Sequence, residues 1–151
     1  MKNFSIEEVL PHAEPMILLD ELISFEDETA TCSHTITESS LLYNQNLQGV
    51  PSYVGIEYMA QSIAAYANAN EISQGRAVEI GFLVSSRKYK CDYSVFTKGM
   101  KLIVKVDKLY SDESGLSAFD CSISENDKAL ATARINVFQP NDPAKFLAEQ
   151  L

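Results

Sequence analysis

The chain contains 151 residues, of which 46% are hydrophobic, and carries a formal net charge of -9 at pH 7. This length and hydrophobic content fit one globular domain over residues 1–151, without room for a second of ordinary size. The acidic balance argues against nonspecific nucleic-acid binding, and no apolar run approaches the roughly 20 residues that span a bilayer. The N-terminus lacks a signal-peptide pattern, so we expect a cytoplasmic protein.

The first predicted elements are two strands, over residues 16–25 and 29–36, which are joined by an acidic turn. Residues 39–51 are rich in Ser, Asn and Gly with little periodicity, which predicts an irregular connection. An alanine-rich helix is expected next, at about residues 53–70. Long loops inside compact domains are usually functional, which draws attention to the segment before this helix.

The rest of the chain reads as sheet. Strands are predicted over residues 78–89, 100–110, 116–124 and 129–138, and we expect them to follow one another as a meander. The tail, residues 139–151, is mildly amphipathic and is compatible with a short terminal helix. Two strands, one long helix and four strands predict an α+β fold of order β-β-α-β-β-β-β, whose single main helix covers one face of an antiparallel sheet.

Several kinds of site find no support in the sequence, because of the spacing of its cysteines and the absence of common motifs. Cys32, Cys91 and Cys121 are far apart, without a CxxC pair, which argues against a disulfide framework and a zinc knuckle. We therefore expect reduced, buried thiols and no metal site. The sequence also lacks GxSxG, GxGxxG and Walker-type loops, so serine hydrolysis and nucleotide binding have little support.

Glu57 places one carboxylate in the otherwise apolar start of the predicted helix. At helical spacing its neighbours are Val54, Ala60, Gln61 and Ala64. Ser52 is a plausible N-cap, which puts Glu57 near the helix N-terminus. The helix dipole favours the charged carboxylate whereas burial favours the neutral acid, and such opposed effects tune acid–base residues. We expect chemistry at Glu57, with a buried structural glutamate as the alternative.

Two motifs resemble a known enzyme family. Residues 10–20, Leu-Pro-His-Ala-Glu-Pro-Met-Ile-Leu-Leu-Asp, resemble the Leu-Pro-His-Arg-x-Pro-x-Leu-Leu-x-Asp opening of 3-hydroxyacyl-acyl-carrier-protein dehydratases. Residues 57–61, Glu-Tyr-Met-Ala-Gln, resemble that family's Glu-Ala-Met-Ala-Gln helix. The longer string over residues 55–61, Gly-Ile-Glu-Tyr-Met-Ala-Gln, is most similar to the dehydratase-like subgroup associated with aryl polyene biosynthesis. The resemblance covers roughly residues 9–138.

The resemblance implies a hotdog fold, in which an antiparallel sheet wraps around one long central helix and two subunits pair to form active sites. It implies a hydro-lyase that converts a 3-hydroxyacyl thioester to a trans-2-enoyl thioester. The substrate would be carried on the phosphopantetheine of an acyl carrier protein, without a further cofactor. In the family, the helix glutamate handles the leaving hydroxyl and a loop histidine removes the proton next to the thioester carbonyl.

The sequence departs from the family in this loop. Tyr43 stands where the loop histidine is expected, and a neutral phenol is a poor base at neutral pH. The only histidines are His12, in the motif that lines the family's site, and His34. An imidazole suits a general base, so we expect Glu57 and His12 to form the acid–base pair, with loop packing as the alternative for His12. His34, on an apolar strand face, is expected to be structural.

The remaining site residues follow from the resemblance and from charge. Amides near Gly55 are expected to polarise the thioester carbonyl, while Gln61 holds a substrate oxygen or orients Glu57. The expected substrate-binding residues are Tyr43, Gly49, Pro51, Gly55, Gln61, Gly81, Phe82 and Leu83, the last three in an acyl tunnel. A basic span over residues 87–108 would dock the acidic carrier protein, chiefly through Arg87, Lys88 and Lys90. Outward strand positions are the plainer explanation of these cations.

The leading hypothesis is thus a 3-hydroxyacyl thioester dehydratase that works as a homodimer or as a heterodimer with another hotdog subunit, in aryl polyene or fatty-acid-type biosynthesis. A second hypothesis is a noncatalytic hotdog subunit that partners an active dehydratase, which the missing loop histidine favours. A third is an acyl thioesterase, because a helix carboxylate can also activate water. The fold alone does not choose among them.

Overall fold

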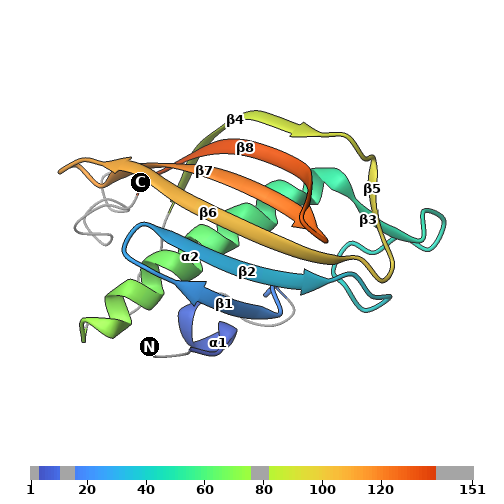
Figure 1. Ribbon diagram of the computed structural model, residues 1–151, viewed down its shortest axis with the longest axis horizontal. Helices are drawn as coiled ribbons and strands as arrows, with labels where there is room; N and C mark the ends of the chain where they lie inside the picture. Colours follow the sequence, from blue (N-terminus) through green and yellow to red (C-terminus); the bar gives the residue numbers. More distant parts are fainter. Residues whose placement is uncertain (1–3, 11–15, 76–81, 139–151) are drawn as a thin grey trace, which may run out of the picture.

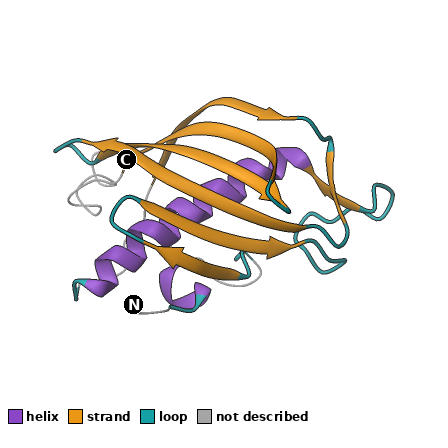
Figure 2. Ribbon diagram, in the orientation of Figure 1, coloured by secondary structure: helices purple, strands orange, loops and turns teal. Residues whose placement is uncertain are grey.

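The computed structural model describes residues 4–10, 16–75 and 82–138. One long helix lies along the concave face of a curved antiparallel sheet (Figures 1 and 2). The helices are α1 (Ile6–Val9), the 3₁₀ helix η1 (Ser52–Val54) and the long α2 (Gly55–Ser73). The strands are β1 (Glu21–Phe25), β2 (Thr29–Thr35), β3 (Gly49–Pro51), β4 (Phe82–Cys91), β5 (Val95–Thr97), β6 (Lys101–Ser111), β7 (Leu116–Glu125) and β8 (Lys128–Phe138).

The large sheet has six strands in the order β1-β2-β6-β7-β8-β4, and β3 pairs with β5 in a separate two-stranded sheet. The predicted α+β architecture is confirmed. The predicted meander is confirmed for β6, β7 and β8, which pair in chain order. It is wrong for β4, which pairs with β8, while β6 pairs with β2. The chain after β4 first forms β5 beside β3, and then enters the large sheet next to β2.

Several boundaries differ from the predictions for local reasons. The first strand begins at Glu21 rather than at residue 16, since the amide of Leu18 donates to the side chain of Gln61 instead of to a neighbouring strand. Helix α2 begins two residues later and ends three residues later than predicted, at Gly55 and Ser73. The short elements α1, β3 and β5 were not predicted. The predicted terminal helix over residues 139–151 lies outside the described residues.

The core lies between α2 and the sheet. Tyr58, Met59 and Ile63 of the helix are at most 3% exposed, and they face buried aliphatic side chains of the central strands such as Val104 and Ile123. Burying an aliphatic or aromatic side chain of this size stabilises the fold by about 1.5–3 kcal/mol. This packing fixes which face of α2 points inward, and therefore which face is left for other contacts.

Two of the three cysteines lie in this core. Cys32 and Cys121 are buried free thiols, whereas Cys91 is half-buried. Burial raises the pKa of Cys32 to about 11. Burial, with Asp120 and Asp107 nearby, raises the pKa of Cys121 to about 12. These two thiols therefore stay protonated at neutral pH and behave as small apolar groups, as expected.

Two amide side chains of α2 hold the N-terminal segment. The side chain of Gln61, 1% exposed, accepts a hydrogen bond from the Leu18 amide at 2.9 Å and donates to the Met16 carbonyl at 2.8 Å. Two turns further on, Asn68 donates to the Val9 carbonyl at 2.8 Å. The helix thereby supplies the hydrogen bonds that a neighbouring strand would otherwise give to this irregular backbone.

Replacing Gln61 with Leu tests this anchor. The Gln61→Leu variant keeps the volume but leaves the Leu18 amide and the Met16 carbonyl without their partner, so the free energy of unfolding should fall by about 2 kcal/mol in urea titrations. The exposed Gln45 offers a matched control, because Gln45→Leu removes no comparable side-chain contact. Equal stability of the two variants would show that Gln61 does not anchor the segment.

Candidate active site

Glu57 is the third residue of α2, at the end of the helix that lies next to β3 and β5 (Figure 1). Its side chain is exposed, whereas its neighbours Tyr58 and Gln61 are buried. The expectation of a buried carboxylate is therefore wrong for the chain by itself. The core contacts of α2 are made by the adjacent helix faces, and Glu57 points away from them into solvent.

The helix start is built differently from the prediction. Ser52 is not the N-cap of α2, because residues Ser52–Val54 form η1 and this 3₁₀ helix runs directly into α2. The Gly55 amide donates to the carbonyls of Ser52 and Tyr53 within this turn. The amide of Gly55 itself is thus already engaged, whereas a role of the other amides near Gly55 in polarising the thioester carbonyl stays a prediction.

The glycine and proline predicted to bind substrate form β3. Gly49 pairs with Thr97 and Pro51 with Val95. A Cβ at Gly49 would overlap the Phe96 carbonyl oxygen and lie 2.6 Å from Val95 Cγ1. Gly49 is therefore required for the close approach of β3 and β5, which support the start of α2. A contact of Gly49 or Pro51 with substrate stays a prediction.

Tyr43, which occupies the position of the expected loop histidine, is half-buried and packs against the hydrophobic core. Its hydroxyl is buried, and in the described part of the chain it has no hydrogen-bond partner. The same holds for the hydroxyl of Tyr58, whose side chain is 1% exposed. Burial raises the pKa of Tyr58, so its phenol keeps its proton at neutral pH. Neither tyrosine therefore replaces the missing histidine as a general base.

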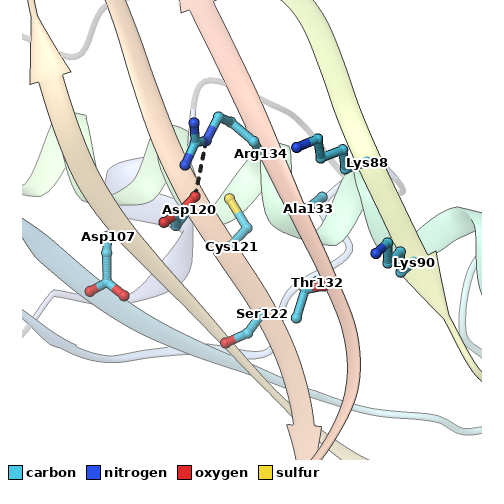
Figure 3. A pocket seen from close by; sticks show the side chains of 9 residues that line it. All are labelled: Lys88, Lys90, Asp107, Asp120, Cys121, Ser122, Thr132, Ala133 and Arg134. Atoms are coloured by element: carbon cyan, nitrogen blue, oxygen red, sulfur yellow. Dashed lines mark hydrogen bonds and ion pairs between the residues drawn. The ribbon is translucent and has the colours of Figure 1, made fainter.

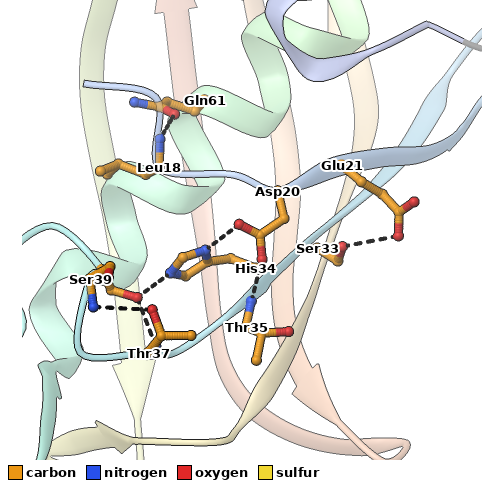
Figure 4. Close-up of polar contacts among 10 residues, drawn as sticks. Leu18, Asp20, Glu21, Ser33, His34, Thr35, Thr37, Ser39 and Gln61 are labelled. Carbon is orange, nitrogen blue, oxygen red and sulfur yellow. Dashed lines mark hydrogen bonds and ion pairs between the residues drawn. The ribbon is translucent and has the colours of Figure 1, made fainter. Parts of the chain in front are cut away.

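His34 is held at both ring nitrogens (Figure 4). Its Nδ1 lies 3.1 Å from Asp20 Oδ1 and its Nε2 lies 2.9 Å from Ser40 Oγ, while the ring packs on Tyr58 at 5.3 Å between centroids. Asp20 also accepts a hydrogen bond from the Thr35 amide at 2.7 Å. The prediction that His34 is a hydrogen-bonded structural residue agrees with this geometry.

Asp20, His34 and Ser40 have the composition of a serine hydrolase triad, but the Ser40 hydroxyl already takes part in a turn. Ser40 Oγ accepts a hydrogen bond from the Thr37 amide at 2.9 Å, which closes the turn after β2. Because that amide points at the serine oxygen itself, it is not free to stabilise an oxyanion. Asp20, His34 and Ser40 therefore tie the segment before β1, strand β2 and the following loop together.

Several predicted site residues have no described side chain. His12 and Gly81 lie outside the described residues. Phe82 and Leu83 open β4, where their backbones pair with Phe138 and Val137. The acyl tunnel and the base at His12 stay predictions. Gln61 is described, and both ends of its amide bind main chain of the N-terminal segment rather than Glu57.

Two of the predicted docking cations, Lys88 and Lys90 of β4, lie on the face of the sheet opposite α2 (Figure 3), while the side chain of Arg87 is not among those described. Lys88 and Lys90 are exposed and line a groove of about 400 Å³ with residues of β6, β7 and β8. Across the groove, Arg134 is paired with Asp120 at 3.2 Å. Among the described residues, neither lysine has an acidic partner at salt-bridge distance. We call this feature the outer groove.

An antiparallel sheet around one long helix, with a carboxylate in the first turn of that helix, defines a protein of the hotdog class. Residues 4–148 match the ApeP-like family, described as ApeP dehydratase. The chain belongs to this family. No curated protein matches it. In the described residues, no helix is long and apolar enough to cross a membrane.

Solved structures show the same fold. The chain is similar to a chain of the dehydratase heterocomplex ApeI:P from Xenorhabdus doucetiae, with 28% identity, a TM-score of 0.89, and coverage of 99% of this chain and 100% of that one. It shares its fold with the E. coli PaaI protein of the phenylacetic acid degradation operon, at 17% identity, a TM-score of 0.60 and coverage of 78% and 81%. Protein PH1136 of Pyrococcus horikoshii has 11% identity, a TM-score of 0.67 and coverage of 96% and 99%.

The Asp20–His34 contact predicts a pH dependence of stability. Partial burial raises the pKa of Asp20, but hydrogen bonds from His34 and Thr35, together with the charges of His34 and Lys101, outweigh it and lower the pKa below its ordinary value. A lowered folded-state pKa stabilises the protein above the unfolded pKa of about 3.9, and this contribution is lost as the pH falls through the folded value.

Asp20→Asn should therefore lower the free energy of unfolding at pH 7 by about 0.5–1 kcal/mol, a figure reduced for solvent screening of a half-exposed carboxylate. The difference from the unaltered protein should shrink below about pH 4, measured by urea unfolding across pH. The exposed Asp92 provides the control Asp92→Asn. A constant difference at all pH values would contradict the assigned contact.

Proposed function

We propose that the chain is the Glu57-bearing subunit of a 3-hydroxyacyl-acyl-carrier-protein dehydratase, active in aryl polyene or related biosynthesis. The active site is completed by a second hotdog subunit. The observation that carries this proposal is the exposure of Glu57 at the start of α2, in a chain of the dehydratase family. An acid that must hold a proton for the leaving group needs a cover that excludes water, and one chain does not provide it.

The surroundings of Glu57 support a cover by another protein. Tyr53, in η1 just before the helix, is 67% exposed. Met16, whose carbonyl binds Gln61 one turn after Glu57, is 55% exposed. Large apolar side chains that remain in water around a functional group are typical of interaction sites. A second subunit packed here would bury both the apolar rim and the carboxylate.

The structure with the highest identity reported above is a complex of this kind, described as a dehydratase heterocomplex. By analogy we propose a heterodimer rather than two copies of this chain, because the loop of this chain lacks a histidine at Tyr43 and two copies would lack it twice. The partner's loop would supply what this loop does not. His12 is our candidate base within this chain, and the partner subunit is the other source.

The proposed reaction is a β-elimination. A base removes the proton from the carbon next to the thioester carbonyl, the electron pair forms the new double bond, and the hydroxyl leaves from the next carbon. Glu57 protonates the departing oxygen, so that water and a trans-2-enoyl thioester are formed. The step needs no oxidant or reductant, because carbon is neither oxidised nor reduced overall.

We further propose that Lys88 and Lys90 dock the acidic carrier protein. Both lysines remain available in the outer groove, in a chain whose overall net charge is -9. Complementary charge raises association rates and orients partners. Since the groove faces away from α2, the phosphopantetheine would have to pass around the end of the sheet at which α2 begins to reach Glu57.

Glu57→Gln should reduce enoyl formation by about 100-fold or more, because the amide cannot deliver the proton. The assay uses purified chain with its hotdog partner and a 3-hydroxyacyl carrier protein, and monitors enoyl product and free thiol. Thermal stability should not change, since the side chain is exposed. Glu7→Gln, at another exposed position, is the matched control.

The same assay separates the alternatives. Full turnover of Glu57→Gln in the complex would contradict the catalytic role and support a noncatalytic subunit. Release of free thiol without enoyl product would support a thioesterase. Loss of activity in His12→Ala would place the base in this chain, whereas unaltered activity would place it in the partner.

Lys88→Glu with Lys90→Glu should raise KM for the carrier-bound substrate about tenfold and leave kcat at saturation unchanged. Substrate affinity should also lose most of its salt dependence. Lys105→Glu, an exposed position on β6 three strands away, is the control. Equal KM values for the two variants would exclude the outer groove as the docking surface.

A further inference from the structure

Strand β4 contains a β-bulge at an unusual residue. Lys88 has a φ of 56°, in the left-handed region that residues other than glycine rarely adopt. The pairing register shifts here, because Arg87 faces Arg134 and Lys90 faces Thr132, so that one extra residue is inserted in β4. Bulges of this kind redirect a side chain, and they are frequent next to functional sites.

The redirected side chain is Tyr89. Lys88 and Lys90 line the outer groove, whereas Tyr89 reaches the helix side of the sheet. Its hydroxyl donates a 2.5 Å hydrogen bond to the carbonyl of Ser52, the first residue of η1. The Ser52 amide in turn donates to the Ser94 carbonyl at 3.0 Å. The segment that precedes α2 is therefore held on both sides of Ser52 by the β4–β5 region.

The contact also explains Gly55. A Cβ at this position would overlap the Tyr89 hydroxyl, and would lie 3.3 Å from Tyr89 Cζ and 3.0 Å from Ile123 Cδ1. Gly55 has an ordinary helical φ of -54°, so glycine is needed here for space and not for backbone conformation. Glycine thus admits the phenol into the first turn of α2, two residues before Glu57.

We propose that Tyr89 is a positioning residue for Glu57, which couples strand β4 to the start of α2. The inference rests on the proposed function. Tyr89 does not itself act on the substrate, because a backbone carbonyl occupies its hydroxyl. Burial, with Cys91 and Tyr58 nearby, raises the pKa of Tyr89, so the hydroxyl remains a donor at neutral pH.

Strand β4 lies at an edge of the sheet, where a partner subunit could act on Glu57 through Tyr89. Among the described strands, β4 pairs only with β8, and its other edge has no neighbour. A strand edge of this kind is a template for pairing with another chain. A partner that pairs along β4 would set the position of Tyr89, and Tyr89 would set the helix turn that carries Glu57.

The test is a double-mutant cycle with Tyr89→Phe, Gly55→Ala and the double variant. Tyr110→Phe, which removes a hydroxyl from an exposed tyrosine of β6, is the control. For each protein, unfolding in urea is measured on the chain, and kcat, KM and the pH dependence of kcat are measured in the complex with the hotdog partner. Gly55→Ala displaces the Tyr89 hydroxyl without removing it, so it serves as a second probe if Tyr89→Phe does not fold.

We expect Tyr89→Phe to lower kcat by about ten- to a hundredfold with little change in KM, because a misplaced acid acts mainly on the chemical step. The alkaline limb of the kcat profile, where the general acid Glu57 loses its proton, should move as well, which a purely structural change would not cause. Gly55→Ala should destabilise the chain, and the added Tyr89→Phe should recover part of that loss by removing the overlapping hydroxyl.

A kcat for folded Tyr89→Phe equal to that of Tyr110→Phe would overturn the positioning role. Strictly additive unfolding effects of Tyr89→Phe and Gly55→Ala would overturn the contact. If the unaltered complex forms no enoyl product, the proposed function fails, while the unfolding cycle still decides whether Tyr89 and Gly55 are coupled.

Discussion

The contact between Tyr89 and the Ser52 carbonyl holds the segment that opens α2, and in our proposal the geometry of the site depends on it. Because η1 runs directly into α2, the position of η1 fixes the rotation of α2 about its axis, and therefore the direction in which each of its side chains points. With that rotation, Tyr58 and Gln61 enter the core, and Glu57 faces outward. The position of the carboxylate is therefore a consequence of backbone packing and not of any contact made by Glu57 itself.

This separation between scaffold and functional group is consistent with a shared active site. The polar groups that could compete for the carboxylate are committed elsewhere, because Gln61 binds the N-terminal segment and His34 binds Asp20 and Ser40. Glu57 is left in water, and the exposed apolar side chains of Tyr53 and Met16 on neighbouring segments mark an interaction site. In the proposed function a second hotdog subunit covers this site, and the missing loop histidine favours an unlike subunit over a second copy.

The sequence was informative wherever the signal is local. Alternation and turn residues located the hairpin and the long strands, and two motifs identified the family, because these patterns depend on neighbouring residues. Pairing of β4 with β8 and the insertion of Tyr89 beside Gly55 join segments far apart in the chain, so no local pattern reveals them. The exposure of Glu57 was also missed. Apolar neighbours at helical spacing show that a helix is amphipathic, but they do not tell whether one chain covers all of its apolar surface.

The most direct measurement is carboxyl labelling of Glu57 by carbodiimide and an amine, read by mass spectrometry, with the chain alone and with its hotdog partner. The account predicts strong labelling of the isolated chain, where the side chain is exposed, and protection in the complex, with Glu7 labelled equally in both as an internal reference. Equal labelling of Glu57 in both states would contradict the central claim that a second subunit completes the site.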